Sequence, residues 1–218
     1  MTIQLIGYPA STFTLIVIAT LEELGIPFEL TPLTNFADIK TPEYLATKHP
    51  FGMIPVLIDD GFKLYESRAI ARYLVNKYQG TKNSTVLIPS DVQKAALVNQ
   101  YISVETSYFT DPLKKLFYQE IFSKRHGQPV DPEIIKVARE EINKVLDVYE
   151  KLLEGKDYLT GEFSLADIVH YPYTQYAVNS GHGDLFNDPK RPNVARWWKI
   201  ISEREAWKKV ISENKFFD

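Results

Sequence analysis

Four short apolar runs mark the first part of the chain. Each is rich in Ile, Leu, Val or Phe and is bounded by Gly, Pro, Asn or Asp, as expected of β-strands. The last two runs are separated by Asp60-Gly61, a pair that favours the tight turn of a β-hairpin. The strands predicted from these runs are residues 3–7, 26–33, 53–59 and 62–65.

Two longer segments between these runs place their apolar residues at helical spacing. The first extends from Ser11, a residue that can cap a helix, to Gly25, a residue that favours the left-handed end of one. The second extends from Glu66 to Tyr78. The resulting order, β-α-β followed by β-β-α, is thioredoxin-like. Because the chain contains no G-x-G-x-x-G motif, a dinucleotide-binding fold is not expected.

The pattern changes near residue 90 to long amphipathic helices without further strand signals. Helix starts are predicted from three capping patterns, Ser90 to Gln93, Asp131-Pro132 and Ser164 to Asp167. Pro172 is expected to bend the helix that begins at Ser164. We therefore expect an α/β thioredoxin-like domain over residues 1–80, a linker over 81–89, and an all-α domain over 90–218.

Composition excludes several classes of protein. The chain has 218 residues, a net charge of −3 and 24% charged residues, so we expect no nucleic-acid partner. It contains no cysteine, which excludes disulfides, thiolate metal sites and cysteine nucleophiles. Its 4 histidines are scattered without the spacing of metal ligands, so no metal is expected.

No targeting or membrane signal is recognised in the sequence. The start, MTIQLIGYPASTF, lacks the basic residues and long apolar stretch of a signal peptide. The most apolar run, TLIVIATL, is too short to span a bilayer. We expect a cytoplasmic protein without membrane insertion.

Two adjacent features of the segment HPFGMIPVLIDDGFKLYESRAIARYL suggest ligand binding. Pro55 either lies at the edge of a sheet or follows a cis bond, which would turn the backbone of Ile54 towards an extended peptide. Glu66 and Ser67 open a helix, where free N–H groups attract an anion. Together they would suit the zwitterionic head of an amino acid, although the local pattern alone favours an ordinary first-turn acid at Glu66.

A third feature is the hydroxyl of Ser11, in the segment GYPASTFT at the start of the first predicted helix. This hydroxyl could donate to a ligand anion or could cap the helix, and the two roles are compatible. Tyr8 and Thr12 are alternative donors. Ser11 is not expected to act as a nucleophile, since no motif supplies a His-Asp partner or a G-x-S-x-G turn.

These segments together resemble the glutathione transferases, and most closely the serine-type phi class, over almost the whole chain. GYPASTF resembles the serine loop of that class, and HPFGMIPVLIDDGFKLYESRAIARYL resembles its glutathione-binding segment. YLTGEFSLADIVHYPYTQYAVNSG and PNVARWWKIISEREAWKKV resemble its C-terminal domain. The resemblance implies a first domain that binds glutathione as co-substrate and a helical domain that completes a hydrophobic pocket.

The resemblance also implies a role for each matching residue. Ser11 would donate its hydroxyl to the glutathione sulfur, and Ile54 would pair its backbone with the cysteinyl unit. Glu66 and Ser67 would hold the γ-glutamyl end, and Lys40 would face the glycyl carboxylate. The chain departs from the family pattern at two basic positions after the serine, at a histidine and at a glutamine, which are here Leu15, Ile16, Ile39 and Met53.

The implied function is conjugation of the glutathione thiolate to hydrophobic electrophiles, with reduction of organic hydroperoxides as a further activity. The alternative is a non-catalytic carrier of apolar ligands on the same fold. A detoxifying role and a homodimer are also implied. The hydrophobic pocket requires apolar and aromatic residues. Candidates for it are Tyr8, Phe13, Phe36, Tyr108, Phe109 and Tyr118.

Overall fold

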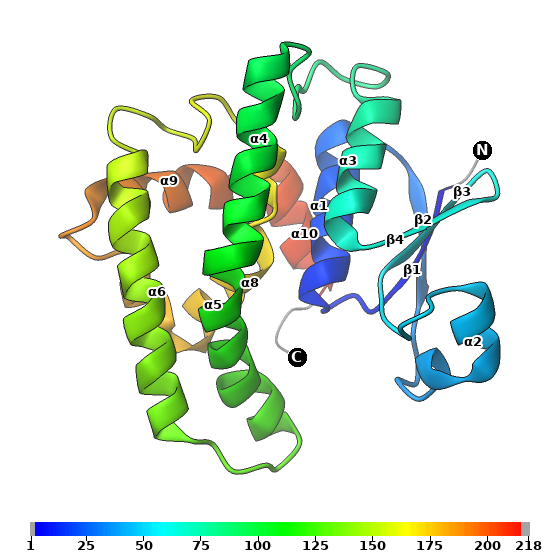
Figure 1. Cartoon of the computed structure of the whole chain (residues 1–218), viewed down its shortest axis with the longest axis horizontal. Coiled ribbons are helices and arrows are strands. Elements are labelled where there is room, and N and C mark those ends of the chain that lie inside the picture. The colour runs from blue at the N-terminus through cyan, green and yellow to red at the C-terminus, as the bar shows by residue number, and fades with distance from the viewer. Residues whose placement is uncertain (1–2, 215–218) are drawn as a thin grey trace. The chain divides into compact units, whose positions relative to one another are not determined.

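The structure is a computed structural model that describes residues 3–214. These residues form two compact units (Figure 1). The first contains residues 3–88 together with 204–214, and the second contains residues 89–203.

The first unit is built on a four-stranded sheet with the order β2-β1-β3-β4. β1 and β2 are parallel, whereas β3 is antiparallel to both β1 and β4. All four predicted strands are present, and β3 begins only after Pro55, which has no N–H to donate to a neighbouring strand. The strands are β1 (Ile3–Gly7), β2 (Phe28–Pro32), β3 (Val56–Asp59) and β4 (Phe62–Tyr65).

Both predicted helices of this unit form where their caps placed them. Ser11 caps α1, and Gly25 ends it with a left-handed φ of 67°. α1 packs beside α3, and Figure 1 shows the two helices together on one side of the sheet. The turn η1 and the helix α2 lie in the connection between β2 and β3, where no periodic pattern predicted them. The bounds are α1 (Thr12–Leu24), η1 (Asp38–Lys40), α2 (Pro42–Thr47) and α3 (Ser67–Tyr78).

The last helix, α10 (Glu205–Asn214), packs against α1 and so lies in the first unit. The sequence predicts a helical domain over 90–218, whereas residues 204–214 belong to the first unit. Glu23, in α1, explains why α10 packs on this unit. It is only 5% exposed and accepts two hydrogen bonds of 2.7 Å from the Arg204 guanidinium. A buried carboxylate requires such a partner, and this pair fixes the start of α10 on α1.

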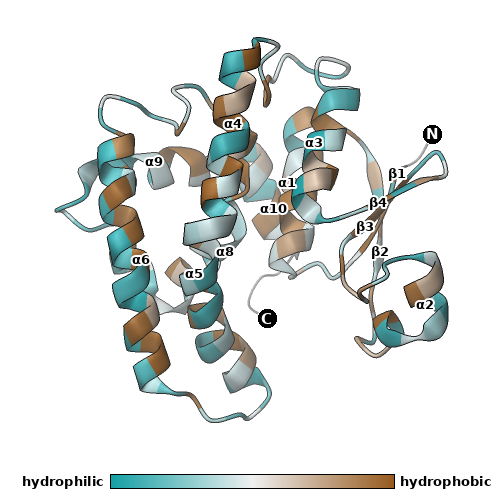
Figure 2. Cartoon of the chain, viewed as in Figure 1, coloured by the Kyte–Doolittle hydropathy of each residue, from teal (hydrophilic) through white to brown (hydrophobic). Residues whose placement is uncertain are grey.

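The second unit is helical, and within residues 89–203 the structure contains no strand. Short π-helical turns interrupt the long helical stretch from α4 to η3. In Figure 2, brown and teal bands alternate along α4 and α6, as expected of amphipathic helices. The elements are α4 (Val92–Val104), η2 (Glu105–Phe109), α5 (Thr110–Phe117), η3 (Tyr118–Ser123), α6 (Pro132–Leu152), α7 (Leu165–Ile168), α8 (Tyr171–Ala177), η4 (Val178–His182), η5 (Gly183–Leu185) and α9 (Pro192–Ser202).

Two of the three predicted helix starts are confirmed, and one is wrong. Asp131 caps α6, and Ser164 with Asp167 forms a capping box at α7. The start of α4 is capped by Asp91 instead of Ser90, because the Asp91 carboxylate accepts from the backbone N–H of Lys94 at 2.9 Å. Pro172 lies in the first turn of α8, after a break that separates this helix from α7.

None of the helices within residues 3–214 is long and apolar enough to cross a membrane.

Candidate functional site

Three segments with candidate site residues leave the sheet at the same end. Ile6, near the end of β1, is paired with Val56 at the start of β3. Val56 is in turn paired with Tyr65 at the end of β4. The loop that follows β1, the segment before β3 and the connection from β4 to α3 therefore lie next to one another. These segments carry Ser11, Ile54 and Glu66.

Ser11 is half-buried at the N-cap of α1. Its Oγ accepts a long hydrogen bond of 3.4 Å from the backbone N–H of Thr14. Within residues 3–214, no acceptor is found for the proton of the Ser11 hydroxyl itself. Because the first turn of α1 contains no acidic residue, the positive end of the helix dipole is not neutralised locally. This arrangement suits a hydroxyl that donates to an anion.

The first turns of α1 and α3 are in contact. The guanidinium of Arg68 lies 5.4 Å from the centre of the Phe13 ring, a cation–π distance. Arg68 also donates from Nη1 to the Oγ of Ser67 at 3.3 Å. The N-termini of two helices thus open beside each other, with a guanidinium between them, which gives this end of the unit a positive local field.

Glu66 has the most unusual backbone conformation of the candidate residues. Its φ of 73° and ψ of 106° lie in a region that residues other than glycine rarely adopt. The side chain is exposed and does not cap α3. An ordinary first-turn acid would need neither feature. Ser67 follows as the first residue of α3 and is 4% exposed.

The segment from His49 to Ile54, here called the 49–54 loop, is held by side chains from η1 and α2. Tyr44 donates its hydroxyl to the carbonyl of Met53 at 2.9 Å. Gly52 has a φ of 60°, and a Cβ at this position would lie 2.5 Å from the Ile39 carbonyl oxygen, so no larger residue fits. The loop ends in a cis Ile54-Pro55 bond, the alternative that would expose the Ile54 backbone. Ile54 itself precedes the residues that pair β3 with β1.

Lys40 is exposed, and its ammonium group lies on the 49–54 loop. It donates to the carbonyl of Gly52 at 2.7 Å and to that of Phe51 at 3.4 Å. An ammonium group has three protons, so the third remains available for a carboxylate. The structure therefore places Lys40 beside the segment that carries Ile54.

His49 is a residue of this site that the sequence analysis did not single out. Only 2% of it is exposed, and its Nδ1 accepts from the backbone N–H of Phe51 at 3.2 Å. The ring lies against Tyr65, with 4.5 Å between the ring centres. The pKa of His49 is lowered, mainly by burial. The Glu66 carboxylate opposes this shift, and the Lys40 ammonium adds to it. The available signal was the segment KHPFG, in which His49 is the first residue of the 49–54 loop.

The candidates for the hydrophobic pocket in the first unit contact other residues of the site. The rings of Tyr8 and Phe36 meet edge to face, 5.4 Å apart, and Phe36 is 56% exposed. Phe13 lies under Arg68, as described above. The half-buried Tyr8 and the exposed Phe36 thus offer an apolar surface to a ligand at the serine loop.

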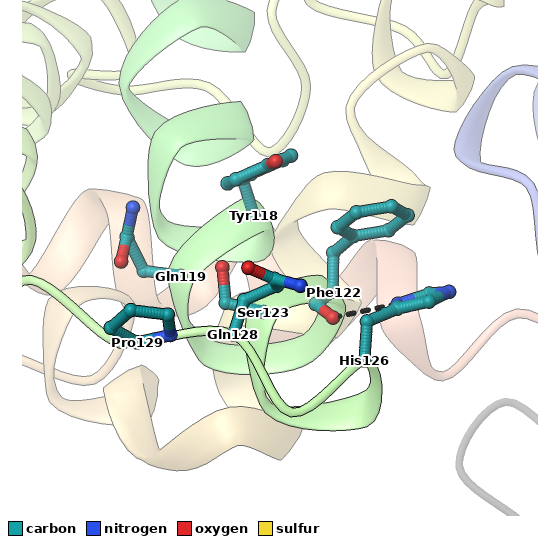
Figure 3. A pocket seen from close by; sticks show the side chains of 7 residues that line it. All are labelled: Tyr118, Gln119, Phe122, Ser123, His126, Gln128 and Pro129. Atoms are coloured by element: carbon teal, nitrogen blue, oxygen red, sulfur yellow. Dashed lines mark hydrogen bonds between the residues drawn. The ribbon is translucent and has the colours of Figure 1, made fainter.

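The candidates in the second unit differ in burial. Phe109 is completely buried and stacks on Tyr149, so it belongs to the core. Tyr108 is 63% exposed and Tyr118 is 51% exposed. Tyr118 stacks on Phe122, with 5.0 Å between the ring centres. Both residues line a cavity of about 400 Å³, together with Gln119, Ser123, His126, Gln128 and Pro129 (Figure 3).

Within the part of the chain that the structure describes, no three His, Asp or Glu side chains come together as a metal site.

Comparison with known proteins places this geometry in a family. The model of the glutathione S-transferase N-terminal domain matches residues 5–82, and that of the C-terminal domain matches residues 115–205. Glutathione S-transferase F10 of Arabidopsis thaliana is 40% identical over 90% of this chain and 90% of its own.

Solved structures agree. Glutathione transferase F2 of Populus trichocarpa has a TM-score of 0.91 and 37% identity over 98% of this chain and 99% of its own. Glutathione S-transferase I of maize, in complex with an atrazine glutathione conjugate, has a TM-score of 0.88 and 32% identity over 99% of both chains. The chain belongs to the glutathione S-transferase family. Its resemblance to the phi class is confirmed by these F-numbered relatives.

Proposed function

We propose that this protein is a serine-type glutathione transferase that conjugates the thiolate of glutathione to hydrophobic electrophiles. The observation that carries the proposal is the position of Ser11. It caps the start of α1 at the same end of the sheet as Ile54 and Glu66, and its hydroxyl proton has no acceptor within residues 3–214. Family membership and the glutathione conjugate in the maize structure support it.

In this proposal the tripeptide lies across the end of the sheet. Its γ-glutamyl ammonium binds the Glu66 carboxylate, and its α-carboxylate binds the start of α3 at Ser67. The cysteinyl unit pairs with the backbone of Ile54 as an added strand would. The glycyl carboxylate faces the remaining donor of Lys40.

The role of Ser11 is to favour the anionic form of the sulfur. A free cysteinyl thiol has a pKa of about 8.5, so only about 3% is thiolate at pH 7. Lowering that pKa to about 6.5 raises the thiolate fraction to roughly 75%, a gain of about 2 kcal/mol. Part of this gain is lost because less basic thiolates are weaker nucleophiles.

The thiolate then attacks the electrophilic carbon, a C–S bond forms, and the leaving group departs with its electron pair. In the first unit, the aromatic rings of Tyr8 and Phe36 offer apolar surface for the electrophile. The same thiolate supports reduction of organic hydroperoxides. In that reaction two glutathione molecules are oxidised to the disulfide while the peroxide is reduced to an alcohol and water.

The test is calorimetric titration with glutathione, followed by conjugation to chlorodinitrobenzene measured by absorbance. Binding together with conjugation well above the uncatalysed rate is expected. Binding without conjugation would favour the carrier alternative, and absence of binding would reject both the site and the function.

We further propose that the protein is a cytoplasmic homodimer with a detoxifying role. The support for a dimer is family membership together with large apolar side chains on the first unit. Phe51, Met53 and Phe62 are 71%, 55% and 50% exposed and are therefore accessible to a second subunit. Sedimentation at micromolar concentration tests the dimer, and a fluorescent fusion tests the location.

A further inference from the structure

The imidazole of His49 connects two parts of the proposed glutathione site. On one side it accepts from the Phe51 N–H within the 49–54 loop, at 3.2 Å. On the other side it lies against Tyr65, with 4.5 Å between ring centres, and Tyr65 directly precedes Glu66. A single buried ring thus contacts the loop before Ile54 and the residue before Glu66.

The hydrogen bond defines the protonation state that this arrangement requires. An N–H donor can bind Nδ1 only when Nδ1 carries no proton, so the neutral ring holds its proton on Nε2. Protonation would place two donors, Nδ1–H and the Phe51 N–H, opposite each other. This hydrogen bond would then be lost, and the loop would no longer be held in its shape by His49.

The same loop carries the other contacts of the site. The backbone N–H of Gly52 donates to the His49 carbonyl at 2.9 Å, and Lys40 donates to the Gly52 carbonyl at 2.7 Å. A shift of the loop would therefore displace both Lys40 and the backbone of Ile54.

We propose that His49 is a positioning residue for glutathione binding: its neutral imidazole holds the 49–54 loop in the binding shape, and its protonation weakens binding at acid pH. This proposal rests on the glutathione site proposed above. It adds a residue and a pH response to that site.

Two charged groups act on the ring in opposite directions, since Glu66 raises the pKa of His49 and Lys40 lowers it. Glu66, at the start of α3, and Lys40, in η1, are the charged groups that influence His49, while Tyr44 from α2 and Tyr65 from β4 contribute backbone and ring contacts. An imidazolium beside Glu66 would compete with the ammonium group of glutathione for that carboxylate. Burial disfavours this imidazolium and lowers the pKa of His49, so the response falls on the acid side of neutrality.

The matched variants are His49→Asn and His49→Leu. An asparagine can accept from the N–H two residues later, as in an Asx turn, and does not titrate. A leucine fills the site without an acceptor. Glutathione affinity is measured by calorimetry from about pH 5 to about pH 7, a range in which an ordinary histidine titrates.

We expect the wild type to bind at least about threefold more weakly near pH 5 than near pH 7, within the limit of about tenfold per pH unit set by one proton. His49→Asn should keep its neutral-pH affinity within about threefold and lose this slope. His49→Leu should bind about tenfold more weakly throughout the range. Equal slopes for the wild type and His49→Asn would overturn the proposal.

A second measurement covers the case in which the variants do not fold. The imidazole proton shift of His49 is titrated by NMR in the wild type, with and without saturating glutathione. Because linkage is reciprocal, glutathione should lower the pKa of His49. An unchanged pKa would overturn the proposal while leaving the glutathione site intact, whereas absence of binding at neutral pH would reject the site itself.

Discussion

The indole N–H of Trp197, in α9, donates to Oδ1 of Asp167, in α7, over 2.9 Å in the core of the helical unit. The same carboxylate accepts from the backbone N–H groups of Leu159, at 3.2 Å, and Ser164, at 3.0 Å. Asp167 therefore ties a loop, a helix start and a distant helix together. Burial raises its pKa to about 6, although the hydrogen bonds from Trp197, Leu159 and Ser164 oppose that shift.

This raised pKa predicts how stability depends on pH. The folded state binds the Asp167 proton more tightly than the unfolded chain does, so this contribution is fully present below about pH 4 and is lost as the pH rises through about 6. Asp167→Asn should have a lower free energy of unfolding than the wild type. This difference should become smaller by about 3 kcal/mol as the pH rises from about 4 to above about 6. Urea unfolding at several pH values measures it. Glu154→Gln, at an exposed position of the same unit, is the control, and a difference that stays constant with pH would contradict the prediction.

Asp59 should show the opposite dependence. It is 2% exposed and accepts from the Tyr73 hydroxyl and the Lys77 ammonium at 2.7 Å each, and from the Tyr78 hydroxyl at 2.8 Å. Burial alone would raise the pKa of Asp59, but hydrogen bonds from Lys77, Tyr73 and Tyr78 outweigh it and lower the pKa. Such a group stabilises the fold above its unfolded pKa, and the effect is lost as the pH falls through the folded value.

We therefore expect Asp59→Asn to lose about 2–4 kcal/mol of unfolding free energy at pH 7, because three donors lose a charged acceptor. The loss should begin to shrink below about pH 4, where the unfolded chain takes up the proton, and should continue to shrink until the pH falls through the lower folded pKa of Asp59. Denaturant unfolding at neutral and acid pH checks this. A loss that grows on acidification would show that the carboxylate is not the stabilising form.

Ser11→Ala tests the proposed donor to the sulfur. Removing one hydrogen bond to a developing or full anion typically costs a factor of about 100 in rate, so we expect conjugation to fall by about tenfold to a hundredfold. Glutathione affinity should stay within a few-fold of the wild-type value. The pKa of the bound thiol, followed by the absorbance of the thiolate, should rise. Ser212→Ala, on the exposed face of α10, is the control. If Tyr8→Phe gave the loss instead, the donor would be Tyr8.

Glu66 separates binding from stability. Glycine adopts a φ of 73° at little cost. The free energy of unfolding of Glu66→Gly should therefore equal that of the wild type or exceed it by up to about 1 kcal/mol. The same variant should bind glutathione about tenfold more weakly, because it lacks the carboxylate that faces the ligand ammonium. Glu66→Gln keeps the backbone and removes only the charge, so its affinity should also fall. Full affinity in both variants would remove Glu66 from the site.

Local patterns were sufficient for much of the fold. Ser11 and Gly25 bound α1 because a hydroxyl cap and a left-handed residue act within one turn of the chain. The start of α4 is harder to predict because both Ser90 and Asp91 are good caps, and the structure shows that Asp91 accepts the capping hydrogen bond. The place of α10 depended on the pair of Glu23 and Arg204, which no local pattern reveals.

The sequence by itself determined the order of the four strands with α1 and α3, the change to a helical unit near residue 90, the absence of a protein thiol and the family. These depend on residue types and on spacings of a few positions. Only the tertiary structure decided that Glu66 has a positive φ, that Lys40 lies on the 49–54 loop, and that His49 connects this loop to Tyr65. Such relationships arise when segments far apart in the chain pack together, and burial then fixes which hydrogen bonds and protonation states are possible.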